Sequence, residues 1–158
     1  MSTDHTRGAG VHVPPVFYFA VPFVIGYGIH RIWPGDRLPI GQPLRMGVGG
    51  VLLAAGLILA GSAIAWFLRL RVSPLPFRPA SRLVCRGPYR ITRNPMYVGL
   101  AFAYAGLAFL LNTAWPLALL PVGLGLVNRW VIGPEERHLR SAFPGEYAEF
   151  SARVRRWL

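Results

Sequence analysis

Apolar and polar residues alternate in long blocks along this chain of 158 residues. Four segments are predominantly apolar, namely 13–33, 46–68, 95–111 and 115–132. The first two are long enough to cross a hydrocarbon core of ~30 Å as helices. The last two are short and separated only by Asn112 and Thr113, which predicts a tight helical hairpin that barely spans the bilayer. We therefore predict an all-α integral membrane protein with about four transmembrane helices.

The second apolar segment is rich in small residues at roughly helical spacing. They are Gly50, Ala54, Ala55, Ala60 and Gly61. Small residues four positions apart commonly form packing surfaces in membrane helices. The spacing predicts that this face packs closely against another helix.

After the fourth apolar segment the pattern becomes that of an amphipathic helical tail. Apolar residues recur there at steps of three and four, with arginines between them: Leu139, Phe143, Tyr147, Phe150, Val154 and Trp157. Such a tail is expected to lie on the membrane surface or to fold back over the polar loop 69–93. Gly133 can end a helix and Pro134 can start one, so a break is predicted between the fourth span and the tail.

The composition excludes an ordinary soluble domain. The chain is 53% hydrophobic and only 15% charged, and its mean hydropathy is +0.40. The formal net charge is +11, and all seventeen cationic residues are arginines. They lie in loops between apolar segments, which favours membrane lipids over nucleic acid as partners. Because Cys85 is the single cysteine, an internal disulfide or a cysteine-based metal site is excluded.

The distribution of arginines predicts the orientation in the membrane. Four spans would place the N-terminus, the loop 69–93 and the C-terminal tail on one side, together with fourteen arginines. Arg31, Arg37 and Arg45 would lie on the other side. Positively charged loops are retained in the cytoplasm, so both termini are expected to be cytoplasmic. The chain is predicted to form one domain, with a flexible tail over 1–12, two spans over 13–68 and a more polar half over 69–158.

The first candidate site is the stretch RGPYRITRNPMYVG at 86–99. An Asn side chain can accept hydrogen bonds from a first helical turn and a proline has no N–H to leave unpaired, so Asn94 and Pro95 predict a helix start. Unpaired N–H groups and the positive dipole end would lie next to Arg90 and Arg93. Such a helix start suits a carboxylate or a phosphate.

The second candidate site is the pair Glu135 and Glu136, two of only six acids in the chain. They fall in the first turn of the helix predicted to start at Pro134, where carboxylates are favourable. One interpretation is that they only stabilise this helix start and pair with Arg137, Arg140 or the loop arginines. The other is that they bind a ligand.

Three motifs in this order and spacing resemble those of a known family: RGPYRITRNPMYVG, the Glu pair, and FPGEYAEFSARVRRW near the end. The chain is similar over roughly 75–157 to bacterial members of the isoprenylcysteine carboxyl methyltransferase family, in the wider group that includes phospholipid N-methyltransferases. The resemblance implies an enzyme of the bacterial inner membrane that transfers a methyl group from S-adenosylmethionine. Asn94 stands where eukaryotic members usually have His, and Phe150 where Tyr is common.

The resemblance implies a cofactor site in the half 69–158. Its core would be the motif Arg-x-Pro-x-Tyr-x-Gly, here Arg93, Asn94, Pro95, Met96, Tyr97, Val98 and Gly99, together with Glu135 and Glu136. The chemistry of these residues agrees with a site for S-adenosylmethionine. Arg90 or Arg93 with the helix start suits the cofactor carboxylate, a Glu suits its ammonium or ribose, and Tyr89 or Tyr97 offers a ring face. Gly99 would permit close approach, and no metal is required.

The methyl acceptor is predicted from the balance of charge. Arginines outnumber acids around the motifs, which attracts an anion and repels a cationic amine. We predict O-methylation of a carboxylate on a lipophilic small molecule or lipid-modified group, with Arg86 and Arg90 as catalytic residues and Arg78 and Arg82 as further cations to orient the acceptor. Two alternatives stay open: N-methylation of a phospholipid or other lipid amine, and a non-catalytic membrane protein whose arginines bind anionic headgroups.

Overall fold

The protein is described by a computed structural model covering residues 13–35, 37–72 and 82–158. The predicted flexible tail over 1–12 and Arg78 lie outside the described residues. Within them the fold is all-helical and contains no strand, which confirms the all-α part of the predicted fold class. The elements are α1 (Phe17–Ile32), α2 (Gln42–Arg69), the 3₁₀ turn η1 (Gly87–Arg90), α3 (Pro95–Leu110), α4 (Trp115–Val127), the π-helical segment η2 (Asn128–Ile132), α5 (Gly133–Ala142) and α6 (Pro144–Arg153).

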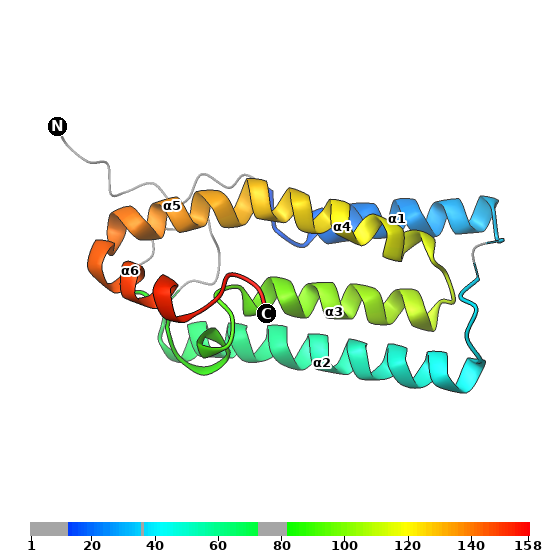
Figure 1. The fold of residues 1–158 in the computed structure, drawn as a ribbon, viewed down its shortest axis with the longest axis horizontal. Coiled ribbons are helices and arrows are strands. Elements are labelled where there is room, and N and C mark those ends of the chain that lie inside the picture. Colours follow the sequence, from blue (N-terminus) through cyan, green and yellow to red (C-terminus); the bar gives the residue numbers. More distant parts are fainter. Residues whose placement is uncertain (1–12, 36, 73–81) are drawn as a thin grey trace.

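The long helices lie side by side along one axis (Figure 1). α2 packs most extensively against α3, and α1 packs against α4, so the bundle consists of two antiparallel helix pairs. The end of α1, the start of α2 and the connection 111–114 lie at one end of the bundle. The start of α1, the segment leading into α3, and α5, α6 and the C-terminus lie at the other end. This arrangement places both polar motifs at the same end.

Small residues hold α2 and α3 together. A Cβ atom at Gly56 would lie 2.5 Å from the backbone nitrogen of Ala103, and one at Gly99 would lie 2.7 Å from that of Ala60. The backbones therefore touch, as small residues allow in membrane helices. Close packing was predicted correctly, but the predicted face was only partly right, because Gly50 and Gly61 face open space.

The predicted helix break at Gly133 is wrong. The helix runs without interruption over Trp115–Ala142, and Gly133 has helical dihedrals. A proline ring in a regular α-helix clashes with the carbonyl four residues before it. Just before Pro134 the chain forms the wider π turn of η2, in which the N–H of Gly133 donates to the carbonyl of Asn128 five residues back. This wider turn lets the helix continue past the proline.

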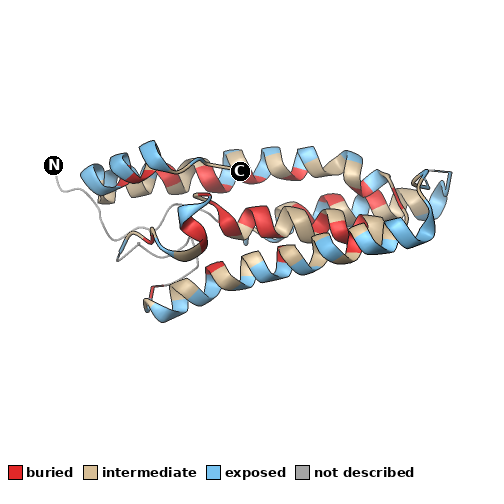
Figure 2. Cartoon of the chain, turned by 60° about the horizontal axis from the view of Figure 1, so that its bottom comes forward, coloured by how far each residue is buried: buried red, intermediate tan, exposed pale blue. Residues whose placement is uncertain are grey.

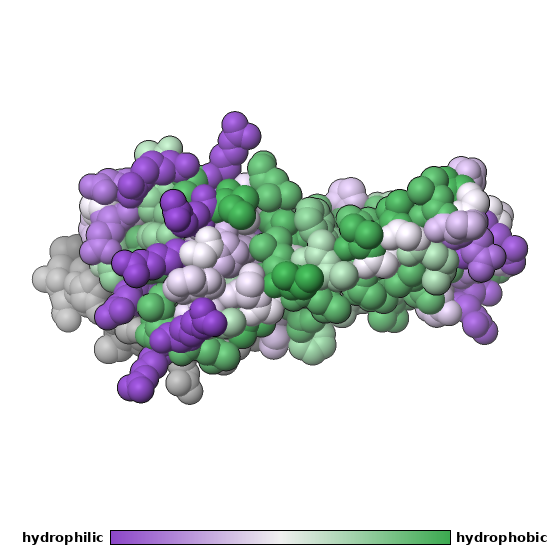
Figure 3. Space-filling model, turned by 90° about the horizontal axis from the view of Figure 1, so that it is seen from below, coloured by the Kyte–Doolittle hydropathy of each residue, from purple (hydrophilic) through white to green (hydrophobic). Residues whose placement is uncertain are grey.

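In the described part of the chain, two helices are long and apolar enough to cross a membrane, α2 and the continuous helix Trp115–Ala142, each of 28 residues. α1 and α3 are apolar but shorter, at 16 residues each, or about 24 Å of helix. On the face seen in Figure 3, an apolar band covers the middle of the molecule and hydrophilic side chains gather at both ends.

Much of this apolar surface faces outward (Figure 2). Val24, Val51 and Ile58, for example, are each about two-thirds exposed or more. A contiguous exposed apolar surface of this kind is characteristic of a membrane-facing region and unfavourable in water.

The amphipathic tail folds back over the polar loop, one of the two positions predicted for it. α6 turns back at Phe143, and its buried residues Tyr147 and Phe150 pack against Val84 and Tyr89. This packing brings the C-terminal residues to the start of α3 (Figure 1).

Candidate functional site

The start of α3 is fixed by residues on both sides of it. α3 begins at Pro95, as predicted. The predicted side-chain cap is absent, however, because the Asn94 amide donates 2.9 Å to the carbonyl of Arg156 instead. The backbone N–H of Asn94 donates to the Thr92 hydroxyl at 3.2 Å. The fully buried Thr92 and the nearly buried Asn94 thus link the helix start to the C-terminal tail.

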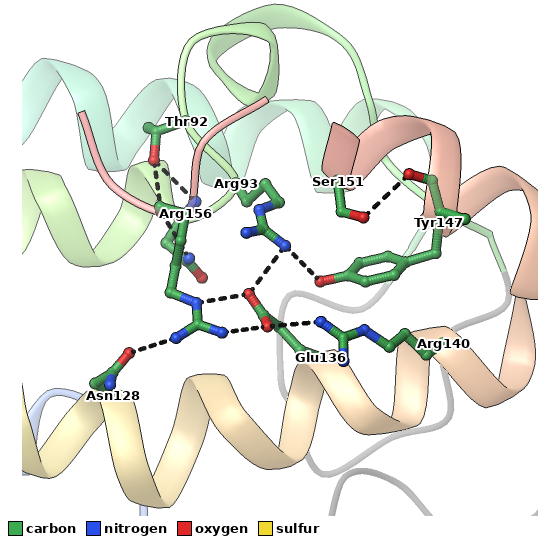
Figure 4. Close-up of polar contacts among 10 residues, drawn as sticks. Thr92, Arg93, Asn128, Glu136, Arg140, Tyr147, Ser151 and Arg156 are labelled. Atoms are coloured by element: carbon green, nitrogen blue, oxygen red, sulfur yellow. Dashed lines mark hydrogen bonds and ion pairs between the residues drawn. The ribbon is translucent and has the colours of Figure 1, made fainter. Parts of the chain in front are cut away.

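Glu136 is the centre of a cluster of charged residues at the same end of the bundle (Figure 4). Its two oxygens accept from Nε and Nη2 of Arg156 at 2.9 and 2.7 Å, a bidentate pair. Nη1 of Arg93 lies 3.2 Å from Oε1, and Nη2 of Arg140 lies 3.7 Å from Oε2. The Glu136 side chain is only 8% exposed. A nearly buried carboxylate is therefore matched by three guanidinium groups.

Arg93 connects this cluster to α6. Its Nη1 donates to the Tyr147 hydroxyl at 3.2 Å. Burial and the nearby Glu136 carboxylate raise the pKa of Tyr147, and the contact with Arg93 opposes this rise. Hydrogen bonding to Glu136 raises the pKa of Arg156. Both groups are therefore held in the protonated forms that donate hydrogen bonds at neutral pH.

Glu135 lies beside the charged cluster and contacts a different residue. The hydroxyl of Tyr97, one turn into α3, donates to Oε2 of Glu135 at 3.4 Å. The two glutamates thus differ, since Glu136 is bound to arginines and Glu135 to a phenol. Glu135 and Glu136 both line a small cavity of about 30 Å³ with Arg93, Asn94 and Tyr147.

Two buried donors near the start of α3 have no hydrogen-bond partner among the described residues. They are the Tyr89 hydroxyl and Nε of Arg93. Tyr89 lies in η1 with its ring packed edge-on against Phe67, and burial raises its pKa. Buried polar groups in native proteins are rarely unpaired. These two donors are therefore available to an acceptor atom of a ligand.

An apolar groove of about 510 Å³ lies next to the charged cluster. It is lined by Val98, Ala101, Phe102, Leu124, Gly125, Asn128, Trp157 and Leu158. Asn128 is the polar residue among them, and its Oδ1 lies 3.5 Å from Nη1 of Arg156. The groove thus has an apolar wall from α3 and α4 and a polar end that adjoins the cluster.

Most of the residues predicted from the sequence come together at this end of the bundle. Arg93, Asn94, Glu135 and Glu136 line one cavity, Pro95 starts α3, Tyr97 reaches Glu135, and Tyr89 is buried close by.

Three other predicted site residues lie outside this cavity: Gly99, Arg86 and Arg90. Gly99 contacts the backbone of α2, so its small size serves helix packing there. Arg86 and Arg90 are exposed on and next to η1, outside the contacts of the charged cluster. Arg82 is also exposed.

Several residues of the site were not singled out from the sequence. They are Thr92, Asn128, Tyr147 and Arg156. Arg156 follows Glu136 by twenty positions, and only the turn before α6 brings the two together. The available signal was the aromatic repeat of the tail, because Tyr147 and Phe150 face inward and direct the following residues toward α3.

Comparison with known proteins gives the family. The family model for "Phospholipid methyltransferase" matches residues 44–146, which include most of α2, the start of α3 and both glutamates. The chain belongs to the phospholipid methyltransferase family. This agrees with the wider group named from the sequence motifs and, with the apolar helices, indicates a membrane protein of a methyltransferase family.

The chain is also similar to the cobalt-zinc-cadmium resistance protein CzcN of Cupriavidus metallidurans. The two are 37% identical over 77 residues, which cover 49% of this chain and 35% of CzcN. The chain thus spans about a third of the length of this relative. No solved structure is similar enough to count as a match.

Proposed function

We propose that the protein is a membrane methyltransferase that uses S-adenosylmethionine to methylate a lipophilic acceptor. The observation that carries this proposal is the cluster around Glu136, which lies beside an apolar groove. Glu136, Arg93 and Arg140 of this cluster fall within the family-matched segment. Charged groups at a membrane border are expensive and usually functional.

The residues fit the cofactor in chemical type. S-adenosylmethionine carries an ammonium, a carboxylate, ribose hydroxyls and a flat adenine. Glu136 can bind a cation, and the unpaired Tyr89 hydroxyl and Arg93 Nε can donate to a carboxylate. The cavity between Arg93 and Glu136, at about 30 Å³, is however only large enough for about one water molecule. Binding therefore requires some side chains at the site to move.

The bound cofactor supplies an electrophilic methyl group on its sulfonium. Such a displacement gains chiefly from orientation and from exclusion of water. In our proposal Glu136 and Arg93 fix the polar part of the cofactor, and Tyr97 and Tyr147 form part of the aromatic wall. The groove gives a lipophilic acceptor a path from the bilayer to the cluster, with Asn128 at the point where they meet.

A carboxylate remains our first choice of acceptor. Three guanidinium groups surround the Glu136 carboxylate, so the cluster attracts anions. A carboxylate is already nucleophilic at neutral pH and needs only orientation. An isoprenylcysteine carboxylate is one such acceptor.

A lipid amine is the second candidate, favoured by the description of the matching family and by Glu135. An amine must lose a proton before or during methyl transfer, so it needs a nearby base. Glu135 accepts from Tyr97 and has no guanidinium within ion-pair distance in the described chain. It is the available carboxylate for that role.

The experiment that tests this function uses S-adenosylmethionine labelled in its methyl group. Membranes that contain the protein are expected to incorporate label into a lipophilic fraction, whereas membranes with the Glu136→Gln variant are not. Mild base releases a methyl ester as volatile labelled methanol, and an N-methyl group stays bound. Base-stable label would favour the amine acceptor. Equal labelling of both membranes would contradict the proposed site.

We further propose four membrane spans with both termini in the cytoplasm of a bacterium. α1 and α3 would cross a slightly thinned bilayer beside the two longer helices. In a Cys85→Ser background, Gly41→Cys and Ala148→Cys each introduce a thiol at an exposed position, at opposite ends of the bundle. An impermeant maleimide added to intact cells should label the Gly41→Cys variant and spare Ala148→Cys. Labelling of both from outside would refute this topology.

A further inference from the structure

The C-terminal tail, residues 154–158, lies across the candidate site. Three consecutive residues before α3 donate to its backbone carbonyls. The N–H of Arg93 donates to Arg155 at 2.9 Å, the Thr92 hydroxyl to Arg156 at 3.0 Å, and the Asn94 amide to Arg156 at 2.9 Å. The tail is therefore bound directly to the start of α3.

The side chain of Arg156 forms an ion pair with the carboxylate of Glu136. Its fork contacts both oxygens, at 2.9 and 2.7 Å. A bidentate pair of this kind is among the stronger polar contacts in proteins. In the proposed function this carboxylate binds a cationic or hydroxyl group of the cofactor. The guanidinium of Arg156 thus takes the position beside Glu136 that the cofactor group would need.

The next residue, Trp157, forms part of the wall of the apolar groove. It also packs against the core cluster that includes Tyr97 and Ile132. Arg156 beside it contacts Glu136, which lines the cavity of about 30 Å³, and Asn128, which lines the groove of about 510 Å³. Ligand pockets usually measure several hundred Å³. The cavity at Glu136 is far smaller than this, and movement of the tail would enlarge it toward the groove.

We propose that residues 154–158 form an autoinhibitory gate in which Arg156 competes with the cofactor for Glu136. This inference rests on the proposed function. With the tail in place the site is closed, and the cofactor binds when Arg156 leaves Glu136 and Trp157 leaves the groove wall. The measured affinity of wild-type protein is then lowered by the small fraction of molecules whose tail is open.

The test is Arg156→Gln, which removes the charged fork. It is expected to raise the affinity for S-adenosylmethionine about tenfold, because the open fraction increases. A structural or cofactor-binding role for Arg156 predicts the opposite, a lower affinity. Arg156→Lys keeps the charge without the fork and should give an intermediate increase. Arg153→Gln is the matched control, since Arg153 is exposed and contacts Glu149 on its own helix.

A second measurement follows the tail without any ligand. The amide of Arg93 is protected by the carbonyl of Arg155, so hydrogen–deuterium exchange of the peptide containing Arg93 reports opening. Exchange should be faster in Arg156→Gln and unchanged in Arg153→Gln. Unchanged exchange, or an affinity that stays equal or falls in Arg156→Gln, would overturn the gate while leaving the proposed function intact. Absence of cofactor binding in the wild type and both Arg156 variants would overturn both.

Discussion

Replacing Glu136 with glutamine is expected to lower the affinity for S-adenosylmethionine ten- to a hundredfold. Glutamine keeps the shape of the side chain and one acceptor oxygen but removes the negative charge. A hydrogen bond to a charged group contributes about 1.5–3 kcal/mol, which corresponds to that range of affinity. Isothermal titration calorimetry of the detergent-purified variant measures the change. Arg93→Ala is expected to act in the same direction, because in the proposed site Nε of Arg93 donates to the cofactor carboxylate.

The matched control for this prediction is Glu149→Gln. Glu149 also pairs with an arginine, but its side chain is 77% exposed and lies on the outer face of α6. Exposed pairs of this kind contribute little, so wild-type affinity is expected. Because Glu136 also binds Arg156 and Arg93, circular dichroism and size-exclusion chromatography must show that Glu136→Gln is folded. Wild-type affinity in a folded Glu136→Gln variant would place the cofactor elsewhere.

Gly56→Val is expected to cause a large loss of stability. Any Cβ at this position would lie 2.5 Å from the Gly99 carbonyl oxygen and from the backbone nitrogen of Ala103. These are backbone atoms of the facing helix, so α2 and α3 would have to separate. Overpacking of this kind typically lowers the free energy of unfolding by about 1–3 kcal/mol or more. The measurement is thermal unfolding in detergent.

The same substitution at Gly61 is the control, because a side chain there would meet open space. Gly61→Val lies on the same helix and makes the same change in helix propensity, so the difference between the two variants isolates the packing. Gly61→Val is expected to unfold close to the wild-type temperature. Equal destabilisation of both variants would show that α2 and α3 do not depend on this contact.

The helices could largely be predicted from the sequence because they depend on local patterns. The length of each apolar segment gave α1 to α4 to within a few residues, and Asn94 followed by Pro95 gave the start of α3. The continuation of the fourth helix through Gly133 and Pro134 could not be predicted. It depends on the π turn of η2, a change of hydrogen-bond register that no single residue signals.

The face of α2 that packs on α3 was also only partly predictable. Gly49 and Gly56 lie on the contact face, whereas Gly50 and Gly61 do not. The helix contains small residues all around its surface. The sequence of one helix therefore does not specify which of them meets a neighbour, since that depends on how both helices are rotated in the bundle.

Site residues of a type that is scarce in this chain could be predicted from the sequence. Site residues of an abundant type could not. Acids are scarce, so Glu135 and Glu136 stood out, and their proximity to Arg93 follows from both motifs lying at one end of the bundle. Arginines are abundant, and nothing local distinguishes Arg156 from Arg90. The fold of the tail selects Arg156 for Glu136 and leaves Arg90 exposed.

The central claim is that the cluster around Glu136 binds S-adenosylmethionine. The most direct test is equilibrium binding of the labelled cofactor to purified wild-type protein in detergent. We expect saturable binding to one site per chain, with unlabelled S-adenosylhomocysteine as a competitor because it carries the same amino acid, ribose and adenine. Absence of saturable binding by folded wild-type protein and by the folded Arg156 variants, at cofactor concentrations up to the millimolar range, would contradict the account.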